Sequence, residues 1–527
     1  MRFIGIIGIL ALLAIGVIFS TNRKAIKVRT VVWGLSLQLL FAAIILGKLW
    51  LSWLGMYLLF SLILFYIFQT QIITIPQTTL KIGRAMLYLL AGAVITLIGY
   101  LTSTVGIAVA LFFIILIIAV VLNLLKKSFY NGYFFAILMQ FGLGILFENR
   151  IAGRDIFRVL ADKVDSFLKL SDLGSIFLFG NLAKPEYFDE FGFQFAFSVL
   201  PTIIFFSAVM SILYYLGVMQ ILVQMMARFM RWTLRTSGAE TLSCSANVFV
   251  GQTEAPLLVR PFLEEMTPSE LHAIMVGGFA TIAGGVLAGY IRMGVDAGHL
   301  IAASVMSAPA ALVMAKIFYP ETEQSKTAGE VTIHTTQKAS NILDATVSGV
   351  TDGLKLAVNV GAMLLAFIAL IGLVDAILGY FDKLVDGQWL GGILGPQGEY
   401  HGIFPGSLKT FFGTLFSPLA FIMGVPWQDA MNVGNLLGIK VAVNEFVAYA
   451  ELGSQIQNAD MSPKAITIAT YALCGFANFS SIGIQIGGIS ALAPSRRSAL
   501  SKVALRAMFA GALASWLTAT VAGILVY

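Results

Sequence analysis

The sequence predicts an all-α polytopic membrane protein. Of its 527 residues, 58% are hydrophobic and only 11% are charged, whereas about 25% are charged in a typical soluble domain. The apolar residues gather in blocks of about 20, the length at which a helix crosses a hydrocarbon core about 30 Å thick. The net charge of +6 would suggest nucleic acid in a soluble protein, but membrane proteins collect basic residues in cytoplasmic loops. We therefore interpret the charge as a topology signal.

The apolar blocks define a set of predicted transmembrane spans. If the N-terminus lies outside, each loop rich in Lys and Arg falls on the cytoplasmic side, as the positive-inside rule requires. The even number of crossings then places both termini outside. The predicted spans are residues 3–20, 30–47, 49–68, 86–101, 105–125, 130–147, 193–218, 268–290, 299–318, 345–380, 463–493 and 505–526.

Two polar segments interrupt this series. Residues 155–170 have apolar positions three and four apart with charges between them, which predicts an amphipathic helix in the membrane interface. Residues 320–342 form one long polar stretch, which we interpret as a cytoplasmic linker. The linker separates two halves of the chain.

Two further regions are apolar but too interrupted to be ordinary spans. Residues 238–262 and 408–449 contain Gly, Pro and polar residues, and counting either region as a crossing would upset the charge pattern. Irregular backbone at membrane depth is tolerated only where protein or a wet cavity satisfies its free N–H and C=O groups. The sequence therefore predicts two re-entrant hairpins, the first entering from the cytoplasmic side and the second from outside.

A weak internal repeat relates the two hairpins. GQTEAP at 251–256 precedes MTPSELHAIMVGGFATIAGG, and NEFVAY at 444–449 precedes MSPKAITIATYALCGFANFSS. Each copy has an intramembrane acid, a Ser/Thr-Pro helix start and a Gly-Phe-Ala break in the next apolar span. Interrupted segments at matching places in two oppositely oriented halves point to a transporter's binding site. The predicted fold is an inverted-repeat transport domain with two re-entrant hairpins and broken helices, plus a scaffold domain.

The polar residues of these hairpins and breaks form the candidate ligand site. A carboxylate near the bilayer centre costs at least about 2.5 kcal/mol, so we expect it to face a cavity and to have a partner. Amides and hydroxyls accompany the acids and no positive charge does, which favours a neutral, hydroxyl-rich, planar-edged ligand over an anion. The set comprises Gln252, Thr253, Glu254, Asn444, Glu445, Asn478, Ser480 and Ser481.

Other chemistries find little support in the sequence. The four histidines show no metal-ligand spacing, and no nucleophile-elbow or phosphate-loop motif is present. Cys244 and Cys474 lie in apolar surroundings, and we interpret them as packing residues. We therefore predict a protein that is not an enzyme and has no cofactor, in which transport draws on an ion gradient or runs downhill.

At these residues the chain resembles the concentrative nucleoside transporter family. The resemblance runs from about residue 190 to the C-terminus and is carried by ANVFVGQTEAPLLVRPFL, SELHAIMVGGFATIAGGVLAGY, NEFVAYAEL and YALCGFANFSSIGIQIGGISALAPSRR, with STNRKAIKVRT near the start. It implies a nucleoside:cation symporter of the bacterial inner membrane that contacts lipid and forms a homotrimer, with no nucleic-acid partner. It also implies an elevator mechanism, in which transport domains of two hairpins and two broken helices move within a fixed scaffold.

The resemblance also assigns roles to residues near the hairpin tips and helix breaks. It assigns the nucleobase to Gln252, Thr253, Glu254 and Val286. It assigns the ribose to Glu445, Asn478 and Ser481, with Phe476 nearby. Sodium, if it is the coupling ion, would bind the side chains of Asn247 and Thr281 and the carbonyls of Val250 and Ile282.

The chain departs from shorter bacterial members near its N-terminus. Roughly 90 extra residues lie within 48–147 and are predicted to hold about four crossings, which leaves the remaining topology unchanged. Packing at the outer rim of a trimer is the simplest interpretation, with a regulatory or partner role as the alternative. The predicted parts are 1–48 (N-terminal pair), 49–147 (insertion), 148–235 (interfacial and scaffold helices), 236–319 (first transport repeat), 320–342 (linker), 343–407 (scaffold helix and connection) and 408–527 (second transport repeat and terminal helix).

Three questions stay open in the sequence. The coupling ion is either sodium or a proton carried by Glu254 or Glu445, since desolvation raises the pKa of a carboxyl group. The base preference is either purine or pyrimidine. The alternatives to symport are a membrane-embedded receptor or enzyme acting on nucleoside-like ligands, and a passive nucleoside channel. Hairpins that occlude the path from both sides argue against an open channel.

Overall fold

The computed structural model describes residues 2–71, 81–101, 131–187, 190, 194–327, 329, 339–395 and 398–526. These residues form helices and one isolated bridge between Leu394 and Tyr400, with no strand among them. They divide into two compact units, Leu39–Leu160 and a larger unit of Met1–Gln38 with Ala161–Tyr527. The predicted all-α fold class is confirmed. The predicted span 105–125 and residues 328 and 330–338 of the predicted linker lie outside the described residues.

The smaller unit packs three apolar helices against one another: α3 (Leu49–Gln71), α4 (Lys81–Leu101) and α6 (Asn131–Glu148). The fully buried Gln140 joins them, because its amide donates to Ser61 at 3.4 Å and accepts from Thr96 at 2.9 Å. Polar side chains of this kind hold helices together where lipid supplies no hydrogen bonds. After α6, α7 (Gly153–Leu168) forms the helix predicted at 155–170.

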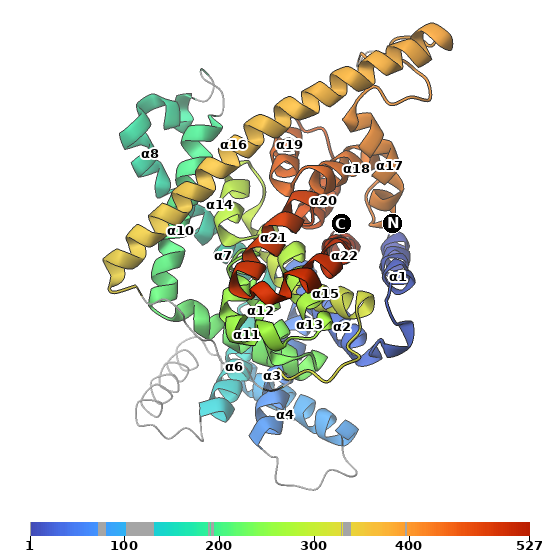
Figure 1. Cartoon of the computed structure of the whole chain (residues 1–527). Coiled ribbons are helices and arrows are strands. Elements are labelled where there is room, and N and C mark those ends of the chain that lie inside the picture. The colour runs from blue at the N-terminus through green and yellow to red at the C-terminus, as the bar shows by residue number, and fades with distance from the viewer. Residues whose placement is uncertain are drawn as a thin grey trace. The chain divides into compact units, whose positions relative to one another are not determined.

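The larger unit begins and ends at the same place. α1 (Arg2–Ile18) packs along α22 (Arg497–Leu525), and Gly5 lies against Ile524, so the two chain ends are neighbours (Figure 1). The other helices before the repeats are η1 (Arg23–Ala25), α2 (Val28–Leu46), α8 (Ser171–Phe179), η2 (Gly180–Ala183), η3 (Pro185–Tyr187) and α10 (Phe195–Tyr215).

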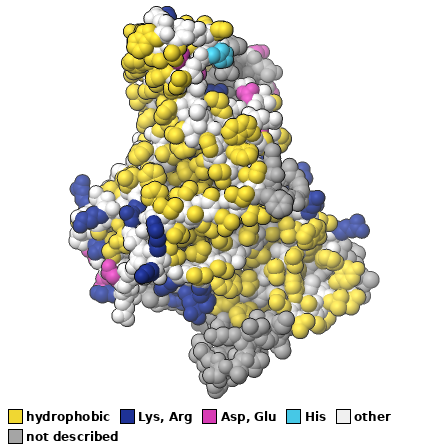
Figure 2. Space-filling model, turned by 90° about the vertical axis from the view of Figure 1, so that its right-hand side faces the viewer, with side chains coloured by type: hydrophobic (Ala, Val, Ile, Leu, Met, Phe, Trp, Pro, Cys, Tyr) yellow, Lys and Arg dark blue, Asp and Glu magenta, His cyan; other side chains and the backbone are white. Residues whose placement is uncertain are grey.

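Seven helices of the described residues are long and apolar enough to cross a membrane, which makes this a multi-pass membrane protein. The longest described helix, α16 (Ile342–Asp382), packs against α10 and continues into η5 (Lys383–Trp389) (Figure 1). Its apolar side chains are widely exposed, as for Leu343 at 73% and Leu365 at 77%. Hydrophobic side chains cover much of the visible surface in Figure 2, as expected of a protein surrounded by lipid.

Two runs of helices in the larger unit repeat the same packing. α11 packs on α12 as α17 packs on α18, α12 packs on η4 as α18 packs on α19, and α13 packs on α15 as α20 packs on α22. The first run is α11 (Val218–Leu234), α12 (Gly238–Ala246), η4 (Ala255–Glu265), α13 (Pro268–Ala280), α14 (Gly284–Arg292) and α15 (Ala297–Phe318). The second run is α17 (Leu408–Ile422), α18 (Trp427–Ala442), α19 (Glu445–Gln457), α20 (Pro463–Leu473), α21 (Phe479–Leu492) and η6 (Pro494–Arg496), followed by α22.

Each run contains one hairpin. The first hairpin, α12 and η4, lies where residues 238–262 predicted it. The second lies further along than the predicted 408–449, because its arms are α18 and α19 and the chain turns at Val443 and Asn444. α17 is a separate helix, bent by 117° from α18. Its apolar composition had merged it with the hairpin arm in the prediction.

Each run also contains one broken helix, as the internal repeat predicted. α13 and α20 both start with a Ser or Thr cap before a proline, at Thr267 and Ser462. The two breaks meet, because Phe476 N–H donates to the carbonyl of Thr281 at 3.3 Å. Gly475 has a φ of +146°, and a Cβ there would lie 2.6 Å from the Phe279 carbonyl oxygen. Glycine is therefore required for the two breaks to approach each other.

Candidate functional site

The tip of the first hairpin carries three of the predicted residues, and the solvent exposure of their side chains increases along the chain. Gln252 is buried, Thr253 is half-buried and Glu254 is exposed. Thr253 donates from Oγ1 to Glu254 Oε1 at 3.0 Å, which links the two outer side chains. The tip thus combines one buried amide with a hydroxyl and a carboxylate that a ligand can reach.

The second hairpin places a buried carboxylate at its turn. Asn444 caps α19 by accepting from Val447 N–H at 2.9 Å, which puts Glu445 in the first turn of the helix. Glu445 is 4% exposed and accepts from Tyr290 on α14 at 3.3 Å and from Asn478 Nδ2 at 3.0 Å. Both donors are neutral, and the carboxylate forms no ion pair with a described side chain. Its oxygens can accept further hydrogen bonds, so acceptor positions are left for a ligand.

Asn478 is shared between this carboxylate and the start of α21. Its Oδ1 accepts from Ser481 N–H at 2.8 Å and from Ser480 Oγ at 2.7 Å, while its Nδ2 faces Glu445. Asn478 is fully buried. Capping of the half-helix thus fixes the amide that orients the Glu445 carboxylate.

One hydrogen bond brings the two predicted residue sets together. Gln252 donates from Nε2 to Ser481 Oγ at 3.2 Å, across 229 residues of sequence. Val286 is buried on α14 and Phe476 is half-buried at the break of the second repeat, so both add apolar surface. Among the described residues, Thr253 is the only member of the predicted set that hydrogen-bonds to the Glu254 side chain, so no hydrogen bond joins Glu254 directly to the Glu445 cluster.

Two residues of this cluster, Tyr290 and Gln485, were not predicted from the sequence. Tyr290 lies one turn after Val286 on α14, and Gln485 lies one turn after Ser481 on α21. Gln485 is fully buried and donates to Gln252 Oε1 at 3.0 Å. The available signal was a polar side chain at helical spacing from a predicted site residue, inside an otherwise apolar half-helix.

The predicted cation ligands lie between the first hairpin and the end of α13. Asn247 is 1% exposed and donates from Nδ2 to the Ser243 carbonyl at 3.1 Å, while its Oδ1 has no hydrogen-bond partner among the described residues. Thr281 is equally buried and donates to the Gly277 carbonyl at 2.8 Å. The Asn247 amide lies against the same glycine, where a Cβ would be 3.1 Å from Nδ2.

This arrangement fits a hard cation. An unpartnered buried oxygen, a hydroxyl and the carbonyl end of a half-helix all present negative partial charge. Val250 and Ile282, the other two predicted ligands, lie at the hairpin tip and in the break that follows Thr281. The described residues contain no group of three or more His, Cys, Asp and Glu side chains that would favour a transition metal.

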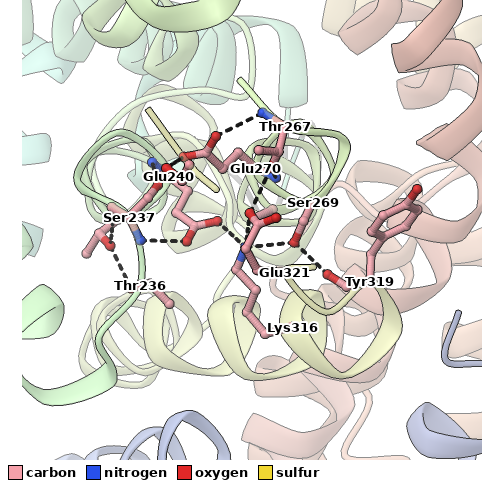
Figure 3. A network of polar contacts seen from close by, with 12 residues as sticks. Thr236, Ser237, Glu240, Thr267, Ser269, Glu270, Lys316, Tyr319 and Glu321 are labelled. Carbon is pink, nitrogen blue, oxygen red and sulfur yellow. Dashed lines mark hydrogen bonds and ion pairs between the residues drawn. The ribbon is translucent and has the colours of Figure 1, made fainter. Parts of the chain in front are cut away.

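The base of the first hairpin is held by a separate polar network (Figure 3). Lys316 on α15 forms an ion pair with Glu240 on α12 at 2.5 Å and donates to Ser269 on α13 at 2.9 Å. Glu240 and Glu270 each complete a capping box, at Ser237 and Thr267. The network ties the ends of α12, α13 and α15 together at the base of the first hairpin.

Three models of known protein families match this chain and together cover most of it. The family models that match are the Na+ dependent nucleoside transporter C-terminus at residues 299–523, nucleoside recognition (gate) at 196–297, and the Na+ dependent nucleoside transporter N-terminus at 7–55. Together they cover both helical runs and the start of the chain.

Individual relatives show the same similarity. Sodium/nucleoside cotransporter 1 of Rattus norvegicus is 43% identical over 73% of this chain, which spans 58% of that relative's length. An uncharacterized transporter of Haemophilus influenzae is 42% identical over 74% of this chain and 90% of its own. The structure of CNTnw in an inward-facing substrate-bound state is 34% identical, with a TM-score of 0.72, covering 100% of this chain and 98% of that one.

Proposed function

The chain belongs to the concentrative nucleoside transporter family, and on that basis we propose that it is a secondary active transporter that imports nucleosides together with a cation. Members of the family are transporters, so the embedded-enzyme alternative falls away. The observation that carries the proposal is the buried Glu445, which Tyr290 and Asn478 hold between the second hairpin and both broken helices. A buried carboxylate with free acceptor positions suits a ligand that carries hydroxyl groups.

The cluster supports a division of the nucleoside between the two repeats. Glu445 would accept from ribose hydroxyls, and Asn478 and Ser481 stand beside it. Gln252 and Thr253 would meet the polar edge of the base, with Glu254 beyond them, while Val286 and Phe476 cover its faces. Each hairpin thus contributes one end of the pocket, and neither suffices alone.

We propose sodium as the coupling ion, bound by Asn247, Thr281 and the carbonyls of Val250 and Ile282. The unpartnered Oδ1 of Asn247 supports this choice, because a buried amide oxygen without a donor gains most from a cation. Asn247 is the C-cap of α12, and Gln252 follows in the tip. Ordering of the tip by the cation would therefore raise nucleoside affinity, and nucleoside would raise cation affinity by the same factor.

We further propose that transport proceeds by elevator-like movement of the two hairpins with their broken helices. The polar network at the base of the first hairpin supports movement of α12, α13 and α15 as one body. The exposed apolar length of α16 suits a scaffold helix that faces lipid or neighbouring subunits. The proposed assembly is a homotrimer in the inner membrane of a bacterium.

The test is uptake of radiolabelled uridine by purified protein in proteoliposomes, with sodium and proton gradients imposed separately. We expect accumulation above equilibrium under the sodium gradient only. Glu445→Gln should abolish accumulation, because the ribose loses its charged acceptor, at a cost of about 1.5–3 kcal/mol or about 10–150-fold in affinity.

The matched control is Glu451→Gln, a carboxylate on the same helix whose partner is Gln455. It should leave uptake unchanged. Wild-type uptake from a Glu445→Gln protein would reject the site, and accumulation driven by a proton gradient alone would reject sodium.

A further inference from the structure

Gln485 is a buried amide that none of the roles above requires. It lies on α21, is fully buried, and uses one nitrogen for two hydrogen bonds. Nε2 donates to Gln252 Oε1 at 3.0 Å and to the main-chain carbonyl of Met275 on α13 at 3.2 Å. Gln485 thus connects the broken helices of both repeats to the buried residue of the first hairpin tip.

The Met275 carbonyl decides which way both amides face. A carbonyl oxygen only accepts hydrogen bonds, so Gln485 must present its NH₂ group to it. The same NH₂ group also donates to Gln252, which accepts through Oε1. Gln485 Oε1 has no partner among the described residues, so no competing contact favours the opposite orientation.

The orientation of Gln252 follows from that of Gln485. With Oε1 turned to Gln485, Nε2 points to the other side, where it donates to Ser481 Oγ. An amide nitrogen carries two protons, and among the described residues Gln252 Nε2 donates only to Ser481. One N–H donor therefore remains for a ligand.

The space for this pair is built into α13. A Cβ at Gly278 would lie 2.7 Å from Gln485 Nε2 and 2.9 Å from Gln252 Cβ, closer than real side chains approach. The absent side chain lets both glutamines lie against the helix. The two amides are thus held by packing as well as by hydrogen bonds.

We propose that Gln485 is a specificity-determining positioning residue that locks the Gln252 amide with its N–H group toward the nucleobase. The pocket then favours bases that present a carbonyl at the position facing Gln252 over bases that present an amino group there. An amino group would meet an N–H donor and leave two buried donors unpaired. This inference rests on the proposed function and adds the class of base edge that the site selects.

The test compares keto and amino bases of equal size in the proteoliposome assay: uridine against cytidine, and inosine against adenosine. The pair whose variable group faces Gln252 should show a keto preference of about tenfold in the wild type, the discrimination expected from one mismatch between two buried donors. Gln485→Met keeps the volume but frees the Gln252 amide to rotate, so the ratio should fall toward one.

Gln485→Glu provides the sharper variant. Its carboxyl group, buried and protonated, donates to the Met275 carbonyl and accepts from Gln252 Nε2. This turns Gln252 Oε1 to the pocket and should reverse the preference in favour of the amino base. The control is Gln455→Met, which removes a buried amide that contacts Glu451 on α19 and should leave the ratio as in the wild type.

A wild type without a keto preference in either pair would overturn the inference, and so would ratios within about twofold of the wild type in both Gln485 variants. If a variant loses uptake, the ratio of dissociation constants, measured by calorimetry on the purified protein in sodium, replaces the ratio of uptake rates and is judged by the same thresholds. Failure of the wild type to accumulate any of the four nucleosides would instead reject the proposed function, which separates the two failures.

Discussion

The two helical repeats share an order of elements but neutralise their buried lysines in different ways. In the first repeat, Lys316 forms an ion pair with Glu240 at the base of the hairpin, at 2.5 Å. In the second, the fully buried Lys440 on α18 forms no ion pair with a described acid and donates to the Ala472 carbonyl and to Ser515 Oγ, both at 2.8 Å. Lys316 is thus stabilised by the charge of a carboxylate, whereas Lys440 is stabilised by the dipoles of a carbonyl and a hydroxyl group.

The difference matters because Ala472 lies at the carbonyl end of α20, just before its break. Such an end carries negative partial charge and favours a cation. The chain itself supplies that cation in the second repeat, through Lys440. At the corresponding end of α13, the chain offers Thr281 and the unpartnered oxygen of Asn247, so we interpret this end as the one left for a dissolved ion.

The largest effect is expected from Lys316→Met. Removal of one partner of a buried ion pair leaves Glu240 buried and uncompensated, which should cost about 3–5 kcal/mol of stability. Thermal unfolding in detergent measures this loss. Replacing Glu240 with Gln in the same protein should recover most of it, whereas equal stability of the single and double variants would contradict the charge-matching interpretation.

Lys440→Met removes the buried lysine of the second repeat, and its loss of stability can be compared with that of Lys316→Met. It also removes a buried lysine, but it leaves only a carbonyl and a hydroxyl behind, so the unfolding transition should shift less than in Lys316→Met. A larger shift than that of Lys316→Met would show that dipoles bind the second lysine more strongly than a carboxylate binds the first.

A second contrast concerns the two helix breaks. Gly475 in the second repeat has a positive φ and approaches the Phe279 carbonyl, whereas Thr281 in the first has an ordinary φ of −124°. Gly475→Ala should therefore cost about 1–3 kcal/mol from backbone strain alone. Ala283→Gly, in the break of the first repeat, is the control and should change stability by less than about 1 kcal/mol. Equal stability of both variants would show that the breaks are flexible.

The smallest effect is expected at the proposed cation site. Asn247→Leu removes one neutral oxygen ligand, so the sodium concentration for half-maximal uptake should rise by about tenfold, or about 1.4 kcal/mol. Uptake at saturating sodium should be largely retained. Asn435→Leu, a buried asparagine on α18 of the second repeat, is the control and should not shift the sodium dependence. If only Asn435→Leu shifted the sodium dependence of uptake, the ion would have to bind in the second repeat instead.

Much of the site could be read from local sequence, because a polar residue in an apolar hairpin is conspicuous. Gln252, Glu445, Asn478 and Ser481 were found in this way, and hydrogen bonds now connect them. Tyr290 and Gln485 were not predicted because each is a single polar residue within an otherwise apolar half-helix. The second hairpin was displaced in the prediction because hydropathy does not separate α17 from α18 where the chain bends.

Local sequence is enough to predict the fold class, the paired hairpins and breaks, and the kinds of side chain at their tips. These features depend on runs of apolar residues and on short motifs, which are local. Three outcomes instead follow from the arrangement in space: which half-helix end receives a lysine, that the side-chain oxygen of Asn247 stays unpartnered, and which way Gln252 faces. Those outcomes depend on contacts such as that between Gln252 and Gln485, 233 residues apart, because an amide has no preferred direction until its partners are placed.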